Sequence, residues 1–161
     1  MAKMIKVGMA DLNICHSPDA ITTLGLGSCV GVALYDKNTK TAGLVHVMLP
    51  DSTKVRQNQN RAKFADTGIE DLITLMVSMG ANKNRLVAKI AGGAKMFATS
   101  GMSEILCVGD RNAEAAKKEL AARNIRILAQ DTGLDYGRTV EFYSETGDYK
   151  IKAVGKGVKV I

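Results

Sequence analysis

The sequence predicts a single α/β domain that spans residues 1–161. Segments with the alternation typical of β-strands occur near both ends of the chain, and two segments with helical spacing lie among them. With 161 residues, 46% of them hydrophobic, the chain is long enough for one well-buried core and too short for two. We therefore expect one domain with one core.

The N-terminal half is predicted to contain an antiparallel β-hairpin. Extended or strand-like segments occupy residues 20–24, 29–35 and 42–49. Only the polar residues 37–41 separate the second of these segments from the third. A connection this short favours antiparallel pairing, which would bring His46 back toward Cys29.

A polar stretch and then a helix follow the hairpin. Residues 51–61 show no apolar periodicity, so we expect a mobile surface loop that borders the functional site. From Phe64 onward, apolar residues recur at the spacing of one helical face, at Ile69, Leu72, Ile73, Met76 and Met79. Gly80 supplies a C-terminal stop for this helix.

The C-terminal half predicts a second helix and further strands. Residues 86–90 form a strand that ends at a glycine pair, so strand, helix and strand follow one another as a crossover unit. Asn112 is a candidate N-cap for a helix that ends near Arg123. The remaining predicted strands are residues 125–128 and a late hairpin of residues 138–144 and 149–154.

Charge and cysteine content limit the possible functions. The formal charge of +6 favours an acidic partner, but basic residues are scattered among acidic ones, and only four Tyr and three Phe are present to stack on bases. We therefore expect no nucleic-acid partner. The three cysteines lack the CxxC spacing of zinc or redox sites, so we expect reduced thiols and no bound metal.

The sequence also lacks the segments that direct a chain into membranes. No stretch approaches the roughly 20 apolar residues that cross a bilayer, and charge interrupts the first residues before a signal-peptide core can form. We therefore expect a cytoplasmic protein without direct membrane insertion.

Residues 23–29 (TLGLGSC) place a cysteine at the end of a glycine-containing loop. Cys29 is a candidate nucleophile and His46 its candidate base, because a thiol needs a neighbouring base or positive potential to ionise near neutral pH. The loop backbone around Gly27 and Ser28 is a candidate donor to an oxyanion. A third residue would orient the imidazole, and the candidates are Asp36, Asp51 and Thr23.

Each of these residues also has a structural interpretation. Cys29 can be a small buried apolar residue, and His46 can be a strand histidine with satisfied hydrogen bonds. The glycine loop lacks the lysine of a P-loop and the third glycine of a dinucleotide loop. Cys15 and His16 are adjacent and would face opposite sides of a strand, so we expect structural roles for both. Cys107, in an apolar run, is expected in the core.

Four segments resemble the CheD family of bacterial chemoreceptor glutamine deamidases, namely TLGLGSCVGVALYD, AGLVHVMLPDS, FADTGIEDLI and AKIAGGAKMF. The resemblance covers nearly the whole chain. It implies a layered α/β fold, with β-sheets covered by two or three helices, similar to the catalytic domains of deamidating bacterial toxins. It further implies Cys29 as nucleophile, His46 as base and Thr23 as orienting residue, without a cofactor or metal.

The resemblance also implies a function and partners. Members of the family hydrolyse selected glutamine side chains on the cytoplasmic helices of methyl-accepting chemotaxis receptors to glutamate, and they bind the phosphatase CheC. An alternative function is an adaptor that binds CheC and receptors and regulates the phosphatase. Proteases and transglutaminases also use thiol acyl transfer. Residues 101–110 (GMSEILCVGD) depart from the family pattern, so any substrate contacts there stay open.

Overall fold

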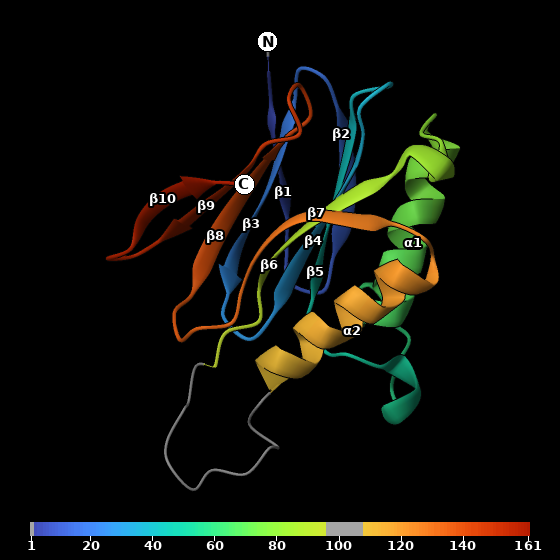
Figure 1. Cartoon of the computed structure of the whole chain (residues 1–161). Helices are drawn as coiled ribbons and strands as arrows, with labels where there is room; N and C mark the ends of the chain where they lie inside the picture. The colour runs from blue at the N-terminus through green and yellow to red at the C-terminus, as the bar shows by residue number, and fades with distance from the viewer. Residues whose placement is uncertain (1, 96–107) are drawn as a thin grey trace, which may run out of the picture.

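The computed structural model describes residues 2–95 and 108–161, and in this part of the chain ten strands form two five-stranded sheets (Figure 1). The first sheet has the strand order β1 (Met4–Val7), β3 (Ala20–Leu26), β8 (Arg138–Tyr143), β9 (Tyr149–Ala153) and β10 (Gly157–Val160). The second has the order β2 (Leu12–His16), β5 (Thr41–Val47), β4 (Val30–Asp36), β6 (Val87–Gly92) and β7 (Arg126–Thr132).

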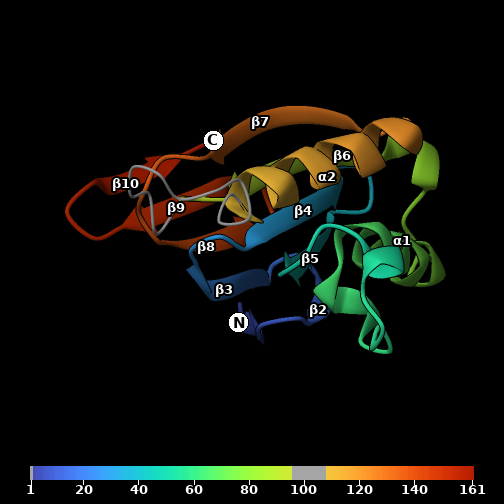
Figure 2. The same cartoon turned by 90° about the horizontal axis from the view of Figure 1, so that it is seen from below.

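Two α-helices, α1 (Ala65–Ser78) and α2 (Val108–Ala122), cover the second sheet on the face that points away from the first sheet (Figures 1 and 2). The described residues therefore form three layers: a sheet, a second sheet and a layer of helices. This arrangement confirms the layered α/β fold. No helix within the described ranges is long and apolar enough to cross a membrane.

Strands β4 and β5 form the centre of the fold, and every residue in both is buried. Alternate side chains point to opposite faces of a strand. One set, including Val32 and Val45, packs against the helices, and the other, including Ala33 and Leu44, packs against the first sheet. Burying one Val or Leu side chain stabilises the fold by about 1.5–3 kcal/mol. The apolar character of both strands reflects burial on both faces.

The predicted hairpin and crossover are confirmed. Strands β4 and β5 pair antiparallel, with Gly31 opposite His46. Strand β6 also pairs antiparallel with β4, so β5 and β6 run parallel and α1 connects them across the sheet. Helix α2 connects β6 to β7, which pair directly and in parallel.

One sequence prediction needs correction. Asn112 does not cap α2, because the helix is already formed at Val108 and the Asn112 side chain is buried inside it.

Residues 51–61, predicted as a surface loop, are mostly exposed. They include a 3-10 helix at Ser52–Lys54 and the start of another at Arg61–Lys63. The backbone N–H and hydroxyl of Ser52 both donate to the Asp66 carboxylate, which holds this segment against α1.

Other predicted elements differ mainly in length. Strand β7 extends from Arg126 to Thr132 rather than ending at residue 128, and β3 continues through Leu26 after a register shift.

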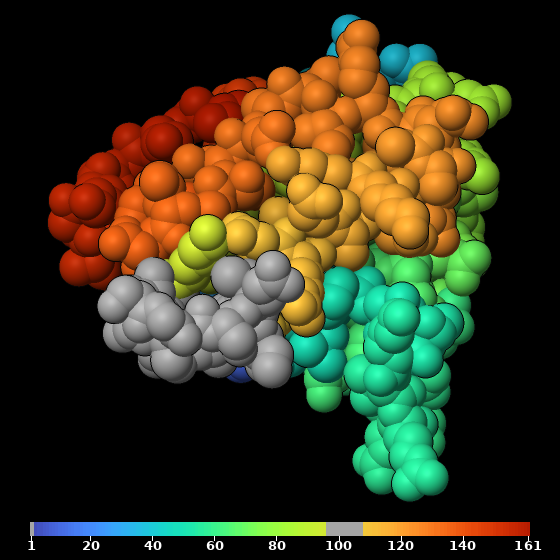
Figure 3. Space-filling view, turned by 60° about the horizontal axis from the view of Figure 1, so that its bottom comes forward, coloured from blue at the N-terminus to red at the C-terminus, as the bar shows by residue number. Residues whose placement is uncertain are grey.

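Figure 3 shows residues 51–60, in teal, projecting beside the gold surface of α2. Cys107 and residues 101–107 of the divergent segment lie outside the described residues.

Candidate active site

Three segments that are distant in sequence bring Thr23, Cys29 and His46 between the two sheets. Thr23 lies on β3, His46 lies on β5, and Cys29 immediately precedes β4. Because His46 is opposite Gly31, and Cys29 stands two positions before Gly31, the cysteine and histidine side chains share the face of the second sheet that points toward the first. Cys29 is 8% exposed, and Thr23 and His46 are fully buried.

The hydrogen bonds of Thr23 determine which nitrogen of His46 carries the proton. The Thr23 hydroxyl lies 2.7 Å from His46 Nδ1 and 2.8 Å from the carbonyl oxygen of Val7. A carbonyl oxygen only accepts, so the single hydroxyl proton is donated to Val7. The hydroxyl oxygen must then accept from Nδ1–H. In the neutral ring, Nε2 therefore carries the free lone pair.

His46 Nε2 is buried and has no hydrogen-bond partner among the described residues. Burial lowers the pKa of His46 from its ordinary value of 6.5, because the charged imidazolium loses its hydration. The ring is therefore neutral at neutral pH. A neutral imidazole with an unpaired Nε2 has the protonation state that a general base requires.

The Cys29 thiol is also neutral at rest. Burial raises the pKa of this thiol above its ordinary value of 9.0, and a hydrogen bond from its own backbone N–H opposes that rise. Because Nε2 has no partner among residues 2–95 and 108–161, no hydrogen bond joins Cys29 to His46 in this structure. The site therefore holds a neutral thiol and a neutral imidazole on the same face of the sheet rather than a preformed ion pair.

The backbone of the 27–29 loop is held in place by its carbonyl groups. The Gly27 carbonyl accepts a 2.8 Å hydrogen bond from Ala94 N–H, and the Cys29 carbonyl accepts a 2.9 Å bond from Gly93 N–H. The Ser28 carbonyl, between them, accepts a 2.9 Å bond from the Asn112 side chain. All three carbonyls therefore have partners, which fixes the path of the chain that carries the thiol.

The amide groups of the same loop differ in their availability. Gly25 has a φ of 70° and turns the chain so that its carbonyl accepts a 3.1 Å hydrogen bond from Gly27 N–H. That amide is consequently occupied. Ser28 N–H has no backbone acceptor in the described part of the chain and is the better candidate donor to an oxyanion.

The two carboxylates considered as orienting residues have other partners. The Asp36 carboxylate accepts hydrogen bonds from Arg85 and from the backbone N–H of Asn82. Asp51 caps a 3-10 helix by accepting from Thr53. Of the three candidates, the one that contacts His46 is Thr23.

The second cysteine–histidine pair has a structural environment. Cys15 is buried, and burial raises the pKa of its thiol to about 11. The His16 ring lies 3.3 Å from the carbonyl oxygen of Met79, which places it at the C-terminus of α1. Within the described ranges, no three Cys, His, Asp or Glu side chains are grouped to hold a metal ion.

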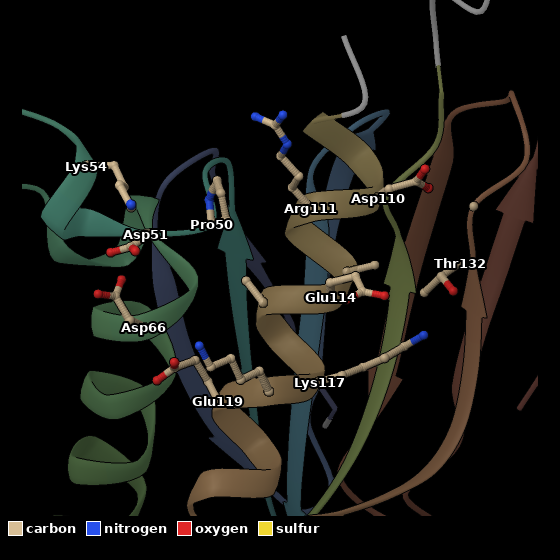
Figure 4. A pocket seen from close by; sticks show the side chains of 14 residues that line it. Pro50, Asp51, Lys54, Asp66, Asp110, Arg111, Glu114, Lys117, Glu119 and Thr132 are labelled. Carbon is tan, nitrogen blue, oxygen red and sulfur yellow. The ribbon is translucent and has the colours of Figure 1, made fainter. Parts of the chain in front are cut away.

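A groove of about 940 Å³ lies beside α2 (Figure 4). Acidic and basic side chains line it together, including Asp51, Lys54, Asp66, Arg111, Glu114 and Lys117. The mixed charges select for no single sign of partner charge. Neither Cys29 nor His46 belongs to this lining, so the groove is separate from the candidate site.

Two contributors to the site, Val7 and Asn112, were not predicted from the sequence. Val7 acts through its backbone carbonyl, which any residue type would supply, so the sequence contains no signal for it. Asn112 does leave a signal, since it shares a helical face with the buried residues Gly109, Ala113, Ala116 and Leu120. An amide on an apolar face indicates a buried hydrogen-bonding role rather than a cap.

The chain is similar to known proteins over its whole length. The family described as CheD chemotactic sensory transduction matches residues 48–153. A protein of Lachnoclostridium phytofermentans named probable chemoreceptor glutamine deamidase CheD is 60% identical over all of both chains. A relative of the same name from Caldanaerobacter subterraneus is 54% identical over 99% of each chain. The chemoreceptor glutamine deamidase CheD of Halalkalibacterium halodurans is 48% identical over all of each chain.

Proposed function

The chain belongs to the CheD family, and from that premise we propose that it hydrolyses glutamine side chains of chemoreceptors to glutamate, with Cys29 as the nucleophile. His46 acts as general base and acid, and Thr23 orients its ring. The observation that carries this proposal is the buried His46 Nε2, which is unprotonated and shares a face with the Cys29 thiol.

In the first half of the reaction the amide is converted to a thioester. His46 Nε2 takes the proton of Cys29 as Sγ attacks the Cδ carbon of the bound glutamine. The amide oxygen becomes an oxyanion, to which Ser28 N–H donates a hydrogen bond. The tetrahedral intermediate then collapses: the C–N bond breaks, and the imidazolium gives its proton to the departing ammonia.

In the second half the thioester is hydrolysed. Water enters the position that ammonia has left, and His46 Nε2 removes one of its protons as its oxygen attacks the acyl carbon. The C–S bond breaks and the sulfur recovers the proton from the imidazolium. Overall, glutamine and one water give glutamate and ammonium once the new carboxyl group has lost its proton to ammonia, and the enzyme returns to its neutral thiol and neutral imidazole.

The neutral resting state has a consequence for the mechanism. Because the pKa of Cys29 is raised and that of His46 is lowered, transfer of the proton in the absence of substrate is unfavourable. The thiolate therefore forms as the substrate carbonyl arrives. An incidental oxidant or alkylating agent therefore reacts with Cys29 more slowly than with a preformed thiolate, and at a rate that depends on His46 taking the proton as the sulfur attacks.

Access to the thiol favours a side chain carried by a larger partner. Cys29 is only 8% exposed, whereas Leu24, five residues earlier in the chain, is 52% exposed. A glutamine side chain on a receptor helix can reach toward the sulfur while the helix contacts exposed side chains such as Leu24. Free glutamine lacks these outer contacts and is expected to be a poor substrate.

The test of this proposal uses a receptor cytoplasmic fragment and measures ammonia release. Cys29→Ala is expected to abolish release, while Cys15→Ala, which removes the other described buried thiol, leaves release unchanged. His46→Ala is expected to lower the rate at which iodoacetamide alkylates Cys29 near neutral pH. Full activity of the Cys29→Ala protein would overturn the proposal.

Mass spectrometry separates deamidation from related acyl transfers. Deamidation raises the mass of the fragment by about one dalton, whereas a protease cleaves it and a transglutaminase cross-links it. The adaptor function is tested with the same variant. If regulating CheC is the main role, the Cys29→Ala protein still stimulates the phosphatase, although it releases no ammonia.

A further inference from the structure

Asn112 connects the segment that carries the nucleophile to the segment that carries the base. It lies on α2, is fully buried, and donates through Nδ2 to the carbonyl oxygens of Ser28 and Met48 at 2.9 and 3.0 Å. Ser28 immediately precedes Cys29, and Met48 follows His46 by two residues. A single side-chain nitrogen therefore holds both chain segments at fixed distances.

The chemistry of the amide group explains why this contact is specific. A side-chain NH₂ has two protons, so one nitrogen can donate to two carbonyls at once. An Asp side chain of the same shape accepts but cannot donate when ionised, and an Ala side chain does neither. Both Asn112 contacts would be lost in either variant.

One polar atom of Asn112 has no partner in the described part of the chain. Its Oδ1 atom is buried and has no hydrogen bond among the described residues. An unpaired buried carbonyl oxygen costs stability, which offsets part of what the two donated bonds contribute. An apolar residue at this position would avoid that cost but would leave the Ser28 and Met48 carbonyls without this donor.

The N-terminal turn of α2 packs against Gly93 and Ala94, which in turn hold the 27–29 loop. A Cβ added to Gly109 would lie 2.3 Å from the carbonyl oxygen of Ala94 and 2.6 Å from that of Gly93. The amides of Gly93 and Ala94 donate to the Cys29 and Gly27 carbonyls. Helix α2 therefore presents Asn112 from a rigid support.

We propose that Asn112 is a positioning residue that sets the distance and orientation of the Cys29 thiol relative to the His46 imidazole. The inference rests on the proposed function of Cys29 and His46. It adds a second support, on a different layer of the fold, to the hydrogen bond that Thr23 makes with the ring. Asn112 itself acts through the backbone of Ser28 and Met48 and does not contact the reacting atoms.

The experiment compares Asn112→Ala and Asn112→Asp with Leu120→Val, a core substitution farther along the same helix. For both Asn112 variants we expect kcat for receptor-fragment deamidation to fall about 10- to 100-fold, because small displacements of reacting groups cost rates of this order. KM is expected to change by less than about threefold, since the substrate contacts stay in place. Leu120→Val is expected to lower the unfolding midpoint while retaining kcat.

A second readout is independent of the substrate. Alkylation of Cys29 by iodoacetamide, followed on the Cys29 peptide, is expected to slow near neutral pH in both Asn112 variants and to need higher pH for the same rate. If the wild-type protein releases no ammonia, the proposed function fails, but the alkylation comparison still tests the positioning role. If Asn112→Asp does not fold because it buries a charge, Asn112→Ala supplies the comparison.

Two results would overturn the positioning role. The first is a folded Asn112→Ala protein with the kcat and the Cys29 alkylation profile of the wild type. The second is a Leu120→Val protein that loses kcat to the same extent, because the loss would then reflect helix packing in general.

Discussion

Gly92 and Cys29 approach so closely that a Cβ at position 92 would lie 2.2 Å from the Cys29 carbonyl oxygen. Gly92 ends β6 with a φ of 112°, a conformation that other residues rarely adopt. The adjacent Gly93 N–H donates to that same carbonyl. The end of β6 therefore sets the position of the backbone that carries the thiol.

Gly92→Ala is expected to lower both stability and activity. The positive φ and the contact with the Cys29 carbonyl together should reduce the free energy of unfolding by about 2–6 kcal/mol. Denaturant unfolding and receptor-fragment deamidation measure the two effects. Gly155→Ala is the matched control, since Gly155 has a φ of 76° but no atom near its added Cβ. It should cost about 1–3 kcal/mol and leave kcat unchanged. Equal kcat in the two variants would contradict the role of Gly92.

Thr23→Val is expected to allow the His46 ring to adopt both neutral tautomers. The variant keeps the shape of the side chain but removes the oxygen that accepts from Nδ1–H, so Nε2 is no longer fixed as the free nitrogen. We expect kcat to fall about 10- to 100-fold. Nitrogen NMR shifts of the His46 ring should show mixed tautomers. Thr22→Val is the control, because Thr22 also donates a buried hydrogen bond, of 2.7 Å to Val140, without contacting His46. A pure Nε2-unprotonated ring in Thr23→Val would refute the assignment.

The lowered pKa of His46 predicts how stability depends on pH. Below pH 6.5 the unfolded chain takes up a proton on this ring, while the folded protein, with its lower pKa, does not. The free energy of unfolding therefore falls as pH falls from 6.5 toward the folded pKa, by at most about 1.4 kcal/mol per pH unit from this group. Subtracting the curve of His46→Gln from that of the wild type isolates the effect. If the difference between the two free energies of unfolding is the same at pH 7 and at pH 5, the lowered pKa of His46 is contradicted.

Asp36 predicts a second pH dependence, at lower pH. Burial alone would raise the pKa of Asp36, but hydrogen bonds from Arg85, Asn82 and Asn38 outweigh it and lower the pKa to about 2. The resulting stabilisation is complete above pH 3.8 and is lost as pH falls from 3.8 to 2. Asp36→Asn should therefore reduce the free energy of unfolding by about 2–4 kcal/mol at pH 7 and by less near pH 2. An equal deficit at both pH values would exclude this linkage.

Local patterns in the sequence were sufficient for most of the secondary structure. The alternation at residues 29–35 and 42–49, with a short polar turn between them, predicted the β4–β5 hairpin, and the apolar spacing after Phe64 predicted α1. These signals are local because strand and helix periodicity and tight turns each involve only neighbouring residues. The same hairpin correctly indicated that His46 returns toward Cys29.

The start of α2 was predicted wrongly from local sequence: the helix begins at Val108 and not after Asn112. An Asn before an apolar helical pattern is typical of an N-cap, and that preference favoured a helix start at Asn112. The spacing of Gly109, Asn112 and Ala116 on one buried face instead indicates that the helix already includes Gly109. The N-cap preference of Asn and this helical spacing favour different starts for the helix. The burial of Asn112 depends on its contacts with Ser28 and Met48, 84 and 64 residues away in the chain.

The fold class, the hairpin and the residue types available for thiol chemistry could be predicted from the sequence, because they follow from periodicity, turn length and side-chain identity. The hydrogen bond between Thr23 and the imidazole, the identity of the free ring nitrogen and the contacts that fix the 27–29 loop are seen in the folded chain. Those outcomes depend on hydrogen bonds from β1, β3 and α2 to segments far away in sequence. Packing between the layers brings the donors and acceptors of these bonds together, and a pattern of neighbouring residues in the sequence carries no information about that packing.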